Sequence, residues 1–195
     1  MILYHASQTK GLTVLEPRVS NHGVPRVYFS EKRENVLVYL SNAIEKHCRE
    51  TGFAWNGPWQ KWGPYGFDPD GRLRLEEYYP DALAQTYKGI PGYIYSAETA
   101  QKEEIFAPLS DIPWSVTASE PVAVSGCEFI PDAYEEILKA ETAGLIRILR
   151  YEEAVQNPKW MDWNRRTMEE EYKNAADHPE YRHFIRAKFG IGKEN

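Results

Sequence analysis

Two short strings near the start of the chain hold the side chains best suited to chemistry. Residues 3–7 read LYHAS, and residues 27–31 read VYFSE. A histidine and a serine at the end of one strand offer hydrogen-bonding groups to a polar ligand, and a tyrosine offers an aromatic face. Both also have a structural interpretation, because His5 can be a strand histidine bonded to a backbone carbonyl and Tyr28 can be a core residue.

Other reaction chemistries have weaker support. The five histidines and two cysteines never fall at the His-x3-His or Cys-x2-Cys spacings that build zinc sites, so we expect no metal site. His47 and Cys48 are neighbours on an expected helix and point in different directions, which argues against a nucleophile and base pair. The paired carboxylates Glu76 and Glu77 are interpreted as part of a solvated face.

The elements around these strings follow from the hydrophobic pattern. We expect a strand over residues 2–5, a polar loop over 18–25 and a second strand over 26–29. Apolar residues then recur at helical spacing from 31 to about 50, and Gly52 stands where a left-handed cap would end that helix. This pattern places His5 and Tyr28 on neighbouring extended segments.

The middle of the chain alternates between strands and short helices. Residues 53–66 carry three tryptophans among prolines and glycines and read as an ordered aromatic loop. A turn over 68–71 predicts a hairpin. Further expected elements are a helix over 80–87, strands over 93–95, 121–129 and 145–150, and a helix over 131–141.

Strand signals stop near residue 151. Two amphipathic helices are expected after it, one beginning at Asn157-Pro158 and one after His178-Pro179. We therefore expect an α+β fold with a mixed or antiparallel sheet. Residues 1–151 would form the body, and residues 152–195 would form a helical appendage docked on that body.

Composition narrows the class of protein. Hydrophobic residues make up 42% of the 195 residues, which is enough for a core and excludes a disordered chain. The net charge of -6 gives no general attraction for a phosphate backbone, so we expect no nucleic-acid partner. The sequence offers no apolar span or signal peptide, which predicts a cytoplasmic protein without a membrane partner.

The two strings together resemble the N-terminal half of the ADP-ribosyltransferase superfamily. In that superfamily a strand with a Tyr-His-Gly-Ser-like motif precedes a strand with an aromatic residue and then a helix. The resemblance implies an ADP-ribosyltransferase-like fold with a nucleotide-binding cleft in residues 1–151. In that cleft His5 would hydrogen-bond a ribose of NAD, Ser7 would hold the nicotinamide amide, and Tyr28 would stack on the nicotinamide ring. Ala6 stands where a glycine is common in the family.

The same resemblance implies a catalytic glutamate at the beginning of a late strand. The corresponding stretch is residues 114–121, WSVTASEP, where Ser115 falls near the glutamate position. Asp111 and Glu120 are the nearest carboxylates and become the candidate catalytic residues. If neither reaches the pocket, the protein would bind NAD without cleaving it.

Two functions of different class follow. The first is an NAD-binding, ADP-ribosyltransferase-like protein, active or degenerate, whose ligand is a nucleotide or related small molecule. The second is a protein-interaction module that binds a partner through the aromatic loop or the C-terminal helices. RNA end processing by a phosphotransferase of related fold would need a basic pocket that the charge distribution does not indicate. The chain also resembles a group of bacterial hypothetical proteins, and this resemblance does not point to any particular activity.

Overall fold

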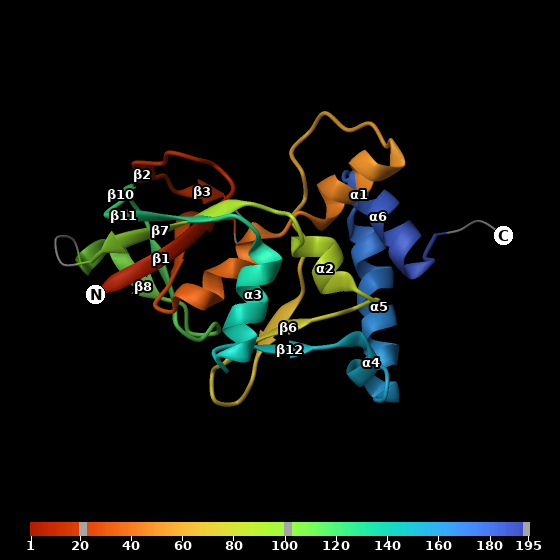
Figure 1. Cartoon of the computed structure of the whole chain (residues 1–195). Helices are drawn as coiled ribbons and strands as arrows, with labels where there is room; N and C mark the ends of the chain where they lie inside the picture. The colour runs from red at the N-terminus through yellow and green to blue at the C-terminus, as the bar shows by residue number, and fades with distance from the viewer. Residues whose placement is uncertain (20–22, 100–102, 193–195) are drawn as a thin grey trace. The chain divides into compact units, whose positions relative to one another are not determined.

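A computed structural model describes residues 1–19, 23–99 and 103–192 of the chain (Figure 1). The fold is α+β, and the chain divides into two compact units. The first comprises Met1–Leu40, Phe67–Leu73 and Gly89–Arg147, and the second comprises Ser41–Gly66, Arg74–Lys88 and Ile148–Asn195. The sequence-based division at residue 151 differs from this, since it placed 41–66 and 74–88 in the body. In the structure both stretches pack with the C-terminal helices.

A seven-stranded antiparallel sheet dominates the first unit. Its strand order is β11-β7-β1-β4-β9-β8, with β3 paired to the free part of β4. The strands are β1 (Ile2–Ser7), β3 (Arg18–Val19), β4 (Pro25–Ser30), β7 (Gly92–Glu98), β8 (Phe106–Pro108), β9 (Ser115–Ala118) and β11 (Gly126–Ile130). The two strings singled out in the sequence therefore lie on adjacent central strands. Residues 20–22 of the expected loop over 18–25 are outside the described residues.

One face of this sheet carries the core of the first unit. Strand β1 pairs with β7 so that Leu3 is opposite Ala97 and His5 is opposite Tyr95. Directly opposed residues share a face, and side chains alternate along each strand. A two-stranded sheet of β2 (Val14–Leu15) and β10 (Val122–Ala123) packs over this face through Leu15 and Val122, which belong to the same buried cluster as Leu3.

The opposite face of the sheet is covered by the 3-10 helix η1 (Arg33–Leu40), which contacts β1, β4 and β7. Helix α3 (Ala133–Thr142) packs against η1. A shorter 3-10 segment, η2 (Glu103–Ile105), precedes β8. Asp132 caps α3 as its side chain accepts the backbone N–H of Tyr134 at 2.9 Å.

The single helix expected over residues 31–50 was wrong. The chain instead forms η1 and then α1 (Ala43–Thr51), with Ser41 and Asn42 between them. Asn42 leaves the helical conformation, and its backbone N–H donates to the Thr86 carbonyl at 3.2 Å. Serine and asparagine favour such breaks because their side chains compete with the helical backbone. The expected left-handed cap at Gly52 is confirmed by its φ of 71°.

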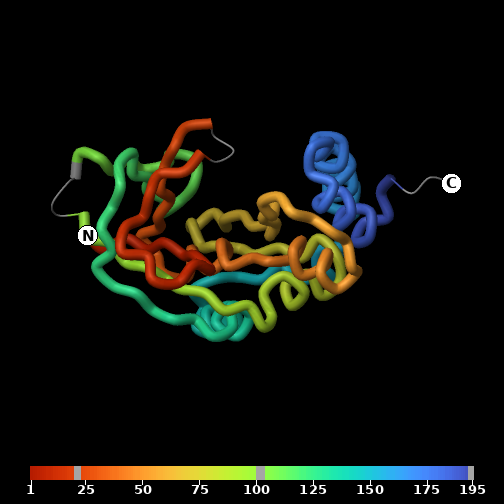
Figure 2. The backbone as a smooth tube through the Cα atoms, turned by 90° about the horizontal axis from the view of Figure 1, so that it is seen from above, coloured from red at the N-terminus to blue at the C-terminus, as the bar shows by residue number. Residues whose placement is uncertain are grey.

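Helices make up most of the second unit. They are α1, α2 (Ala82–Tyr87), α4 (Tyr151–Ala154), α5 (Pro158–Asn174) and α6 (Pro179–Phe189). Figure 2 shows α5 and α6, drawn in blue, lying side by side. A three-stranded sheet of order β12-β6-β5 is formed by β5 (Tyr65–Phe67), β6 (Leu73–Glu76) and β12 (Arg147–Leu149), and it contains the expected hairpin.

The aromatic loop over residues 53–66 packs on the core of its own unit. Trp62 is only 8% exposed and stacks on Tyr79, with ring centroids 5.6 Å apart. Phe184 of α6 lies 5.1 Å from the same indole. Cys48 is a buried free thiol in this core, and burial raises its pKa to about 11.

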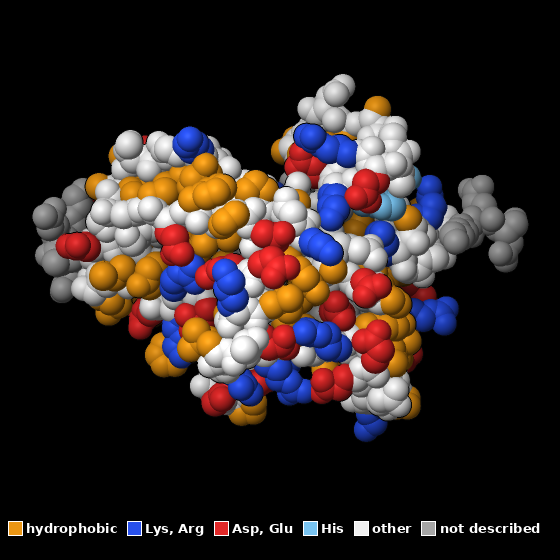
Figure 3. Space-filling view, in the orientation of Figure 1, with side chains coloured by type: hydrophobic (Ala, Val, Ile, Leu, Met, Phe, Trp, Pro, Cys, Tyr) orange, Lys and Arg blue, Asp and Glu red, His pale blue; other side chains and the backbone are white. Residues whose placement is uncertain are grey.

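The surface shows no stripe of one charge on the side that Figure 3 draws. Acidic and basic side chains are interspersed there, and hydrophobic side chains gather in a band at the upper left of the view. Within residues 1–19, 23–99 and 103–192, no helix is both long enough and apolar enough to cross a bilayer.

Candidate nucleotide pocket in the first unit

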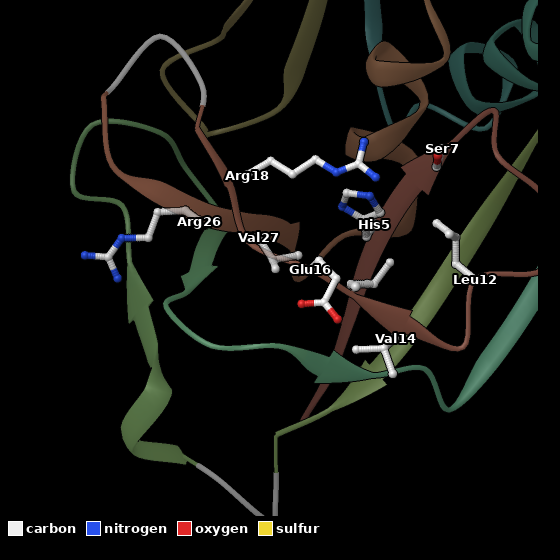
Figure 4. Close-up of a pocket in the computed structure, with 9 residues that line it drawn as sticks. His5, Ser7, Leu12, Val14, Glu16, Arg18, Arg26 and Val27 are labelled. Atoms are coloured by element: carbon white, nitrogen blue, oxygen red, sulfur yellow. The ribbon is translucent and has the colours of Figure 1, made fainter.

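A pocket of about 200 Å³ opens beside the core face of the seven-stranded sheet (Figure 4). Its walls come from β1, β2, β3, β4 and the segments that flank β2, and together they carry both polar and apolar side chains. The residues are His5, Ser7, Leu12, Val14, Leu15, Glu16, Arg18, Arg26 and Val27. Pockets for drug-sized ligands span roughly 300–1,000 Å³, so this one has room for part of a dinucleotide rather than the whole.

His5 is fixed in the pocket wall by its backbone neighbours. Its Nδ1 atom lies 2.8 Å from the backbone carbonyl oxygen of Tyr28, and its ring meets the Phe29 ring edge-on at 6.0 Å. A carbonyl oxygen can only accept, so Nδ1 carries the proton and donates. In the neutral ring the Nε2 atom is then left as a hydrogen-bond acceptor.

The surroundings of His5 keep the ring neutral. Burial lowers its pKa below the ordinary 6.5, and the positive charge of Arg18 lowers it further. The hydrogen bond to the Tyr28 carbonyl acts in the opposite direction but is the smaller influence. Near neutral pH the Nε2 atom of His5 can therefore accept a hydrogen bond from a hydroxyl group, such as one on a sugar.

Ser7 stands where β1 runs into the loop that edges the pocket. Its Oγ accepts the backbone N–H of Thr9 at 3.1 Å. The loop is anchored from below by Tyr95, whose hydroxyl donates to the Thr9 carbonyl at 2.7 Å and accepts the Leu12 N–H at 3.3 Å. Tyr95 is fully buried, so this pair of bonds sets the position of the pocket's rim.

Three charged side chains complete the pocket. Arg18 and Arg26 are directly opposite each other on the β3–β4 ladder, an arrangement that is unfavourable for like charges. Figure 4 shows the Arg18 guanidinium extending over the His5 ring, the Arg26 guanidinium turned the other way, and the Glu16 carboxylate on the other side of His5. Within the described residues, neither arginine forms an ion pair. An anion would relieve this excess of positive charge.

The structure places the side chain of Tyr28 away from this pocket. Its neighbours Val27 and Phe29 belong to the buried cluster on the pocket side of the sheet, so alternation along β4 directs Tyr28 to the opposite face. The expected stacking of Tyr28 on a nicotinamide held by His5 does not fit this orientation. What joins Tyr28 to His5 is its backbone carbonyl.

Neither candidate carboxylate lines the pocket. Asp111 is exposed in the turn before β9, and its carboxylate accepts the Ser110 hydroxyl at 3.0 Å. Glu120 is exposed in the turn after β9. On β9 itself, Phe29 is opposite Val116 and Val27 is opposite Ala118, so the residues that share the face of His5 are apolar.

Sequence reasoning missed Glu16, Arg18 and Arg26 as pocket residues. The signal available was the string Leu15-Glu16-Pro17-Arg18, in which charged residues follow a buried leucine. Arg18 was assigned to the loop over residues 18–25 because a two-residue strand such as β3 leaves no periodicity to detect, and Arg26 was assigned to the strand over 26–29 without a role in a site. The pocket is therefore more basic than the overall charge of -6 suggested.

The described residues do not form a metal-binding cluster. Across the described part of the chain, no group of three or more His, Cys, Asp or Glu side chains is placed to hold an ion.

Comparison with protein families, curated proteins and solved structures found no match.

Proposed function

We propose that this protein binds NAD or a closely related nucleotide with the pocket around His5, in the manner of an ADP-ribosyltransferase-like protein. The observation that carries the proposal is the fixed orientation of His5. Its Nδ1 proton is committed to the Tyr28 carbonyl, so its Nε2 atom faces a ligand as an acceptor. A ribose hydroxyl is a donor that suits this position.

The neighbouring groups match the other parts of a nucleotide. Arg18 offers a guanidinium to the pyrophosphate, because planar arginine donors suit phosphate oxygens. The apolar wall of Leu12, Val14 and Val27 suits the face of a base or nicotinamide ring. Glu16 supplies the negative charge that a cationic sugar needs when its glycosidic bond breaks.

Calorimetric titration with NAD tests this proposal. Saturable binding is expected in the micromolar to millimolar range, about -8 to -4 kcal/mol. His5→Ala removes one acceptor and is expected to weaken binding about fivefold, corresponding to ~1 kcal/mol. Arg18→Gln removes a charged donor and is expected to weaken it about tenfold or more. Circular dichroism checks that each variant is folded.

The matched control is Tyr28→Phe, which keeps the backbone carbonyl and changes only the side chain on the opposite face. It is expected to bind NAD as the unaltered protein does. The absence of any heat of binding with NAD, NADP and ADP-ribose at high protein concentration would contradict the proposal. The protein-interaction alternative would then be favoured, with exposed Met161 and Trp163 of α5 as its first surface to test.

A further inference from the structure

A second pocket lies wholly within the second unit and is separate from the residues of the His5 pocket. It has a volume of about 120 Å³. Liquid water occupies roughly 30 Å³ per molecule, so the space would hold about four waters and suits one compact group. Its walls come from α1, from α2 and the residues just before it, and from α6. The lining residues are Ala43, Lys46, His47, Glu50, Tyr79, Gln85, Phe184 and Lys188.

The walls of this pocket carry more positive than negative charge. Lys188 donates to the side-chain oxygen of Gln85 at 2.6 Å, and Lys46 donates to the Lys88 carbonyl at 3.3 Å. Both acceptors are uncharged. Among the described residues neither lysine forms an ion pair. Glu50 is the one carboxylate among the described lining residues, and it attracts Lys188 from beyond ion-pair distance.

The positive charge of Lys46 disfavours the charged form of Lys188. Burial lowers the pKa of Lys188, and the positive charge of Lys46 lowers it further, against the attraction of Glu50. Two ammonium groups drawn into one pocket with a single opposing carboxylate are an unfavourable arrangement in the empty protein. A bound anion would reverse that balance.

His47 gives an independent indication of a ligand. The residue is only 8% exposed and lines the pocket, yet its buried Nε2 atom has no hydrogen-bond partner within the described residues. Its ring contacts the His183 ring, with centroids 5.1 Å apart, while His183 is bonded to Thr51 at 2.8 Å. A buried polar atom without a partner lowers stability unless something supplies one.

We propose that this pocket binds a phosphate group, held by Lys46 and Lys188 beside His47. A tetrahedral oxyanion fits the volume, offers acceptors to both ammonium groups, and presents an oxygen to the imidazole. The ligand is either inorganic phosphate or the phosphate end of a small ester whose remaining atoms extend out of the pocket. The proposal does not depend on the nucleotide proposed for the first unit.

Titration of the full chain with inorganic phosphate, followed by calorimetry at constant ionic strength set with chloride, tests the proposal. Saturable binding is expected, and Lys188→Gln and Lys46→Gln are each expected to weaken it about tenfold, since each removes a charged donor. Lys159→Gln changes an exposed lysine of α5 in the same unit and is expected to leave the affinity unchanged. Glycerol phosphate is the second probe. Tighter binding of glycerol phosphate than of inorganic phosphate would indicate that the ligand is a phosphate ester.

His47→Phe provides a second readout. It removes the partnerless nitrogen, so the melting temperature without phosphate is expected to stay level or rise, while the increase caused by phosphate becomes smaller. Arg18→Gln separates the two pockets and is expected to bind phosphate normally. Loss of phosphate binding in Arg18→Gln with retention in Lys188→Gln would overturn the proposal, as would the absence of saturation.

Discussion

The Nδ1 atom of His5 and the backbone carbonyl oxygen of Tyr28 lie 2.8 Å apart across two adjacent antiparallel strands. This bond selects one tautomer of the imidazole and turns its other nitrogen toward the pocket. It also explains how Tyr28 can matter to the site through its backbone alone. The chemistry of the pocket therefore depends on the pairing of β1 with β4, since a shift in register would move the carbonyl away.

The first prediction concerns pH. The pKa of His5 in the folded protein lies below 6.5, so the neutral acceptor is present above that pH and is lost as the pH falls through the lowered pKa. We expect NAD affinity to be constant from neutral to mildly alkaline pH and to decline below pH 6.5. Calorimetry across this range should show the decline in the unaltered protein and a flatter profile in His5→Ala.

The stability attributable to His5 follows the same direction. Because folding depresses its pKa, its contribution to the free energy of unfolding is complete above 6.5 and diminishes as the pH falls through the folded value. His47 and His183 also have lowered pKa values, with burial as the main cause, and add to this loss of stability in acid. Both histidines are in the second unit, so their titration should not change how the NAD affinity of the His5 pocket depends on pH.

The second prediction concerns the loop held by Tyr95. Tyr95→Phe removes both bonds of the buried hydroxyl, leaving the Thr9 carbonyl and the Leu12 N–H without that partner. We expect a loss of about 1–3 kcal/mol in the free energy of unfolding, measured by urea denaturation, together with weaker NAD binding. The matched control is Tyr93→Phe on the same strand, which should change stability by less than ~0.5 kcal/mol. Equal effects of the two changes would contradict the anchoring role.

The third prediction concerns the carboxylate of the pocket. If NAD is cleaved, Glu16 is the described carboxylate that lines the site. Glu16→Gln is expected to lower the rate of nicotinamide release about 10²-fold, within the range seen when electrostatic stabilisation is removed. Asp111→Asn and Glu120→Gln should release nicotinamide at the normal rate. A loss confined to either of those variants, or no release by the unaltered protein, would contradict a catalytic role for Glu16.

The fourth prediction concerns Glu77, which joins two segments of the second unit. Its carboxylate accepts the backbone N–H of Leu83 at 3.0 Å and that of Tyr151 at 3.2 Å, at the beginnings of α2 and α4. Glu77→Gln replaces one accepting oxygen with an amide that cannot accept, and should lower the free energy of unfolding by about 1–3 kcal/mol. Thermal unfolding compared with Glu152→Gln, an exposed change on α4, checks it.

The local pattern of the sequence was sufficient for most of the elements. The turn at Asp68–Gly71, the cap at Gly52 and the helix starts at Asp132 and Asn157 each depend on a few adjacent residues, and all are present in the structure. The break at Ser41 and Asn42 was missed because the apolar spacing continues through it. There a tertiary bond, from the Asn42 N–H to Thr86, prevails over periodicity.

The sequence by itself determined that His5 and Tyr28 lie on extended segments rich in core residues, because alternation and β-branched or aromatic residues are local properties. Only the tertiary structure decided which face each side chain occupies, since that depends on the register between strands distant in sequence. The same holds for burial. Glu77 was expected on a solvated face but is 6% exposed. Arg18 of the expected loop and Arg26 of the expected strand both line the His5 pocket, together with Glu16. No local pattern contains the contacts that bring those residues together.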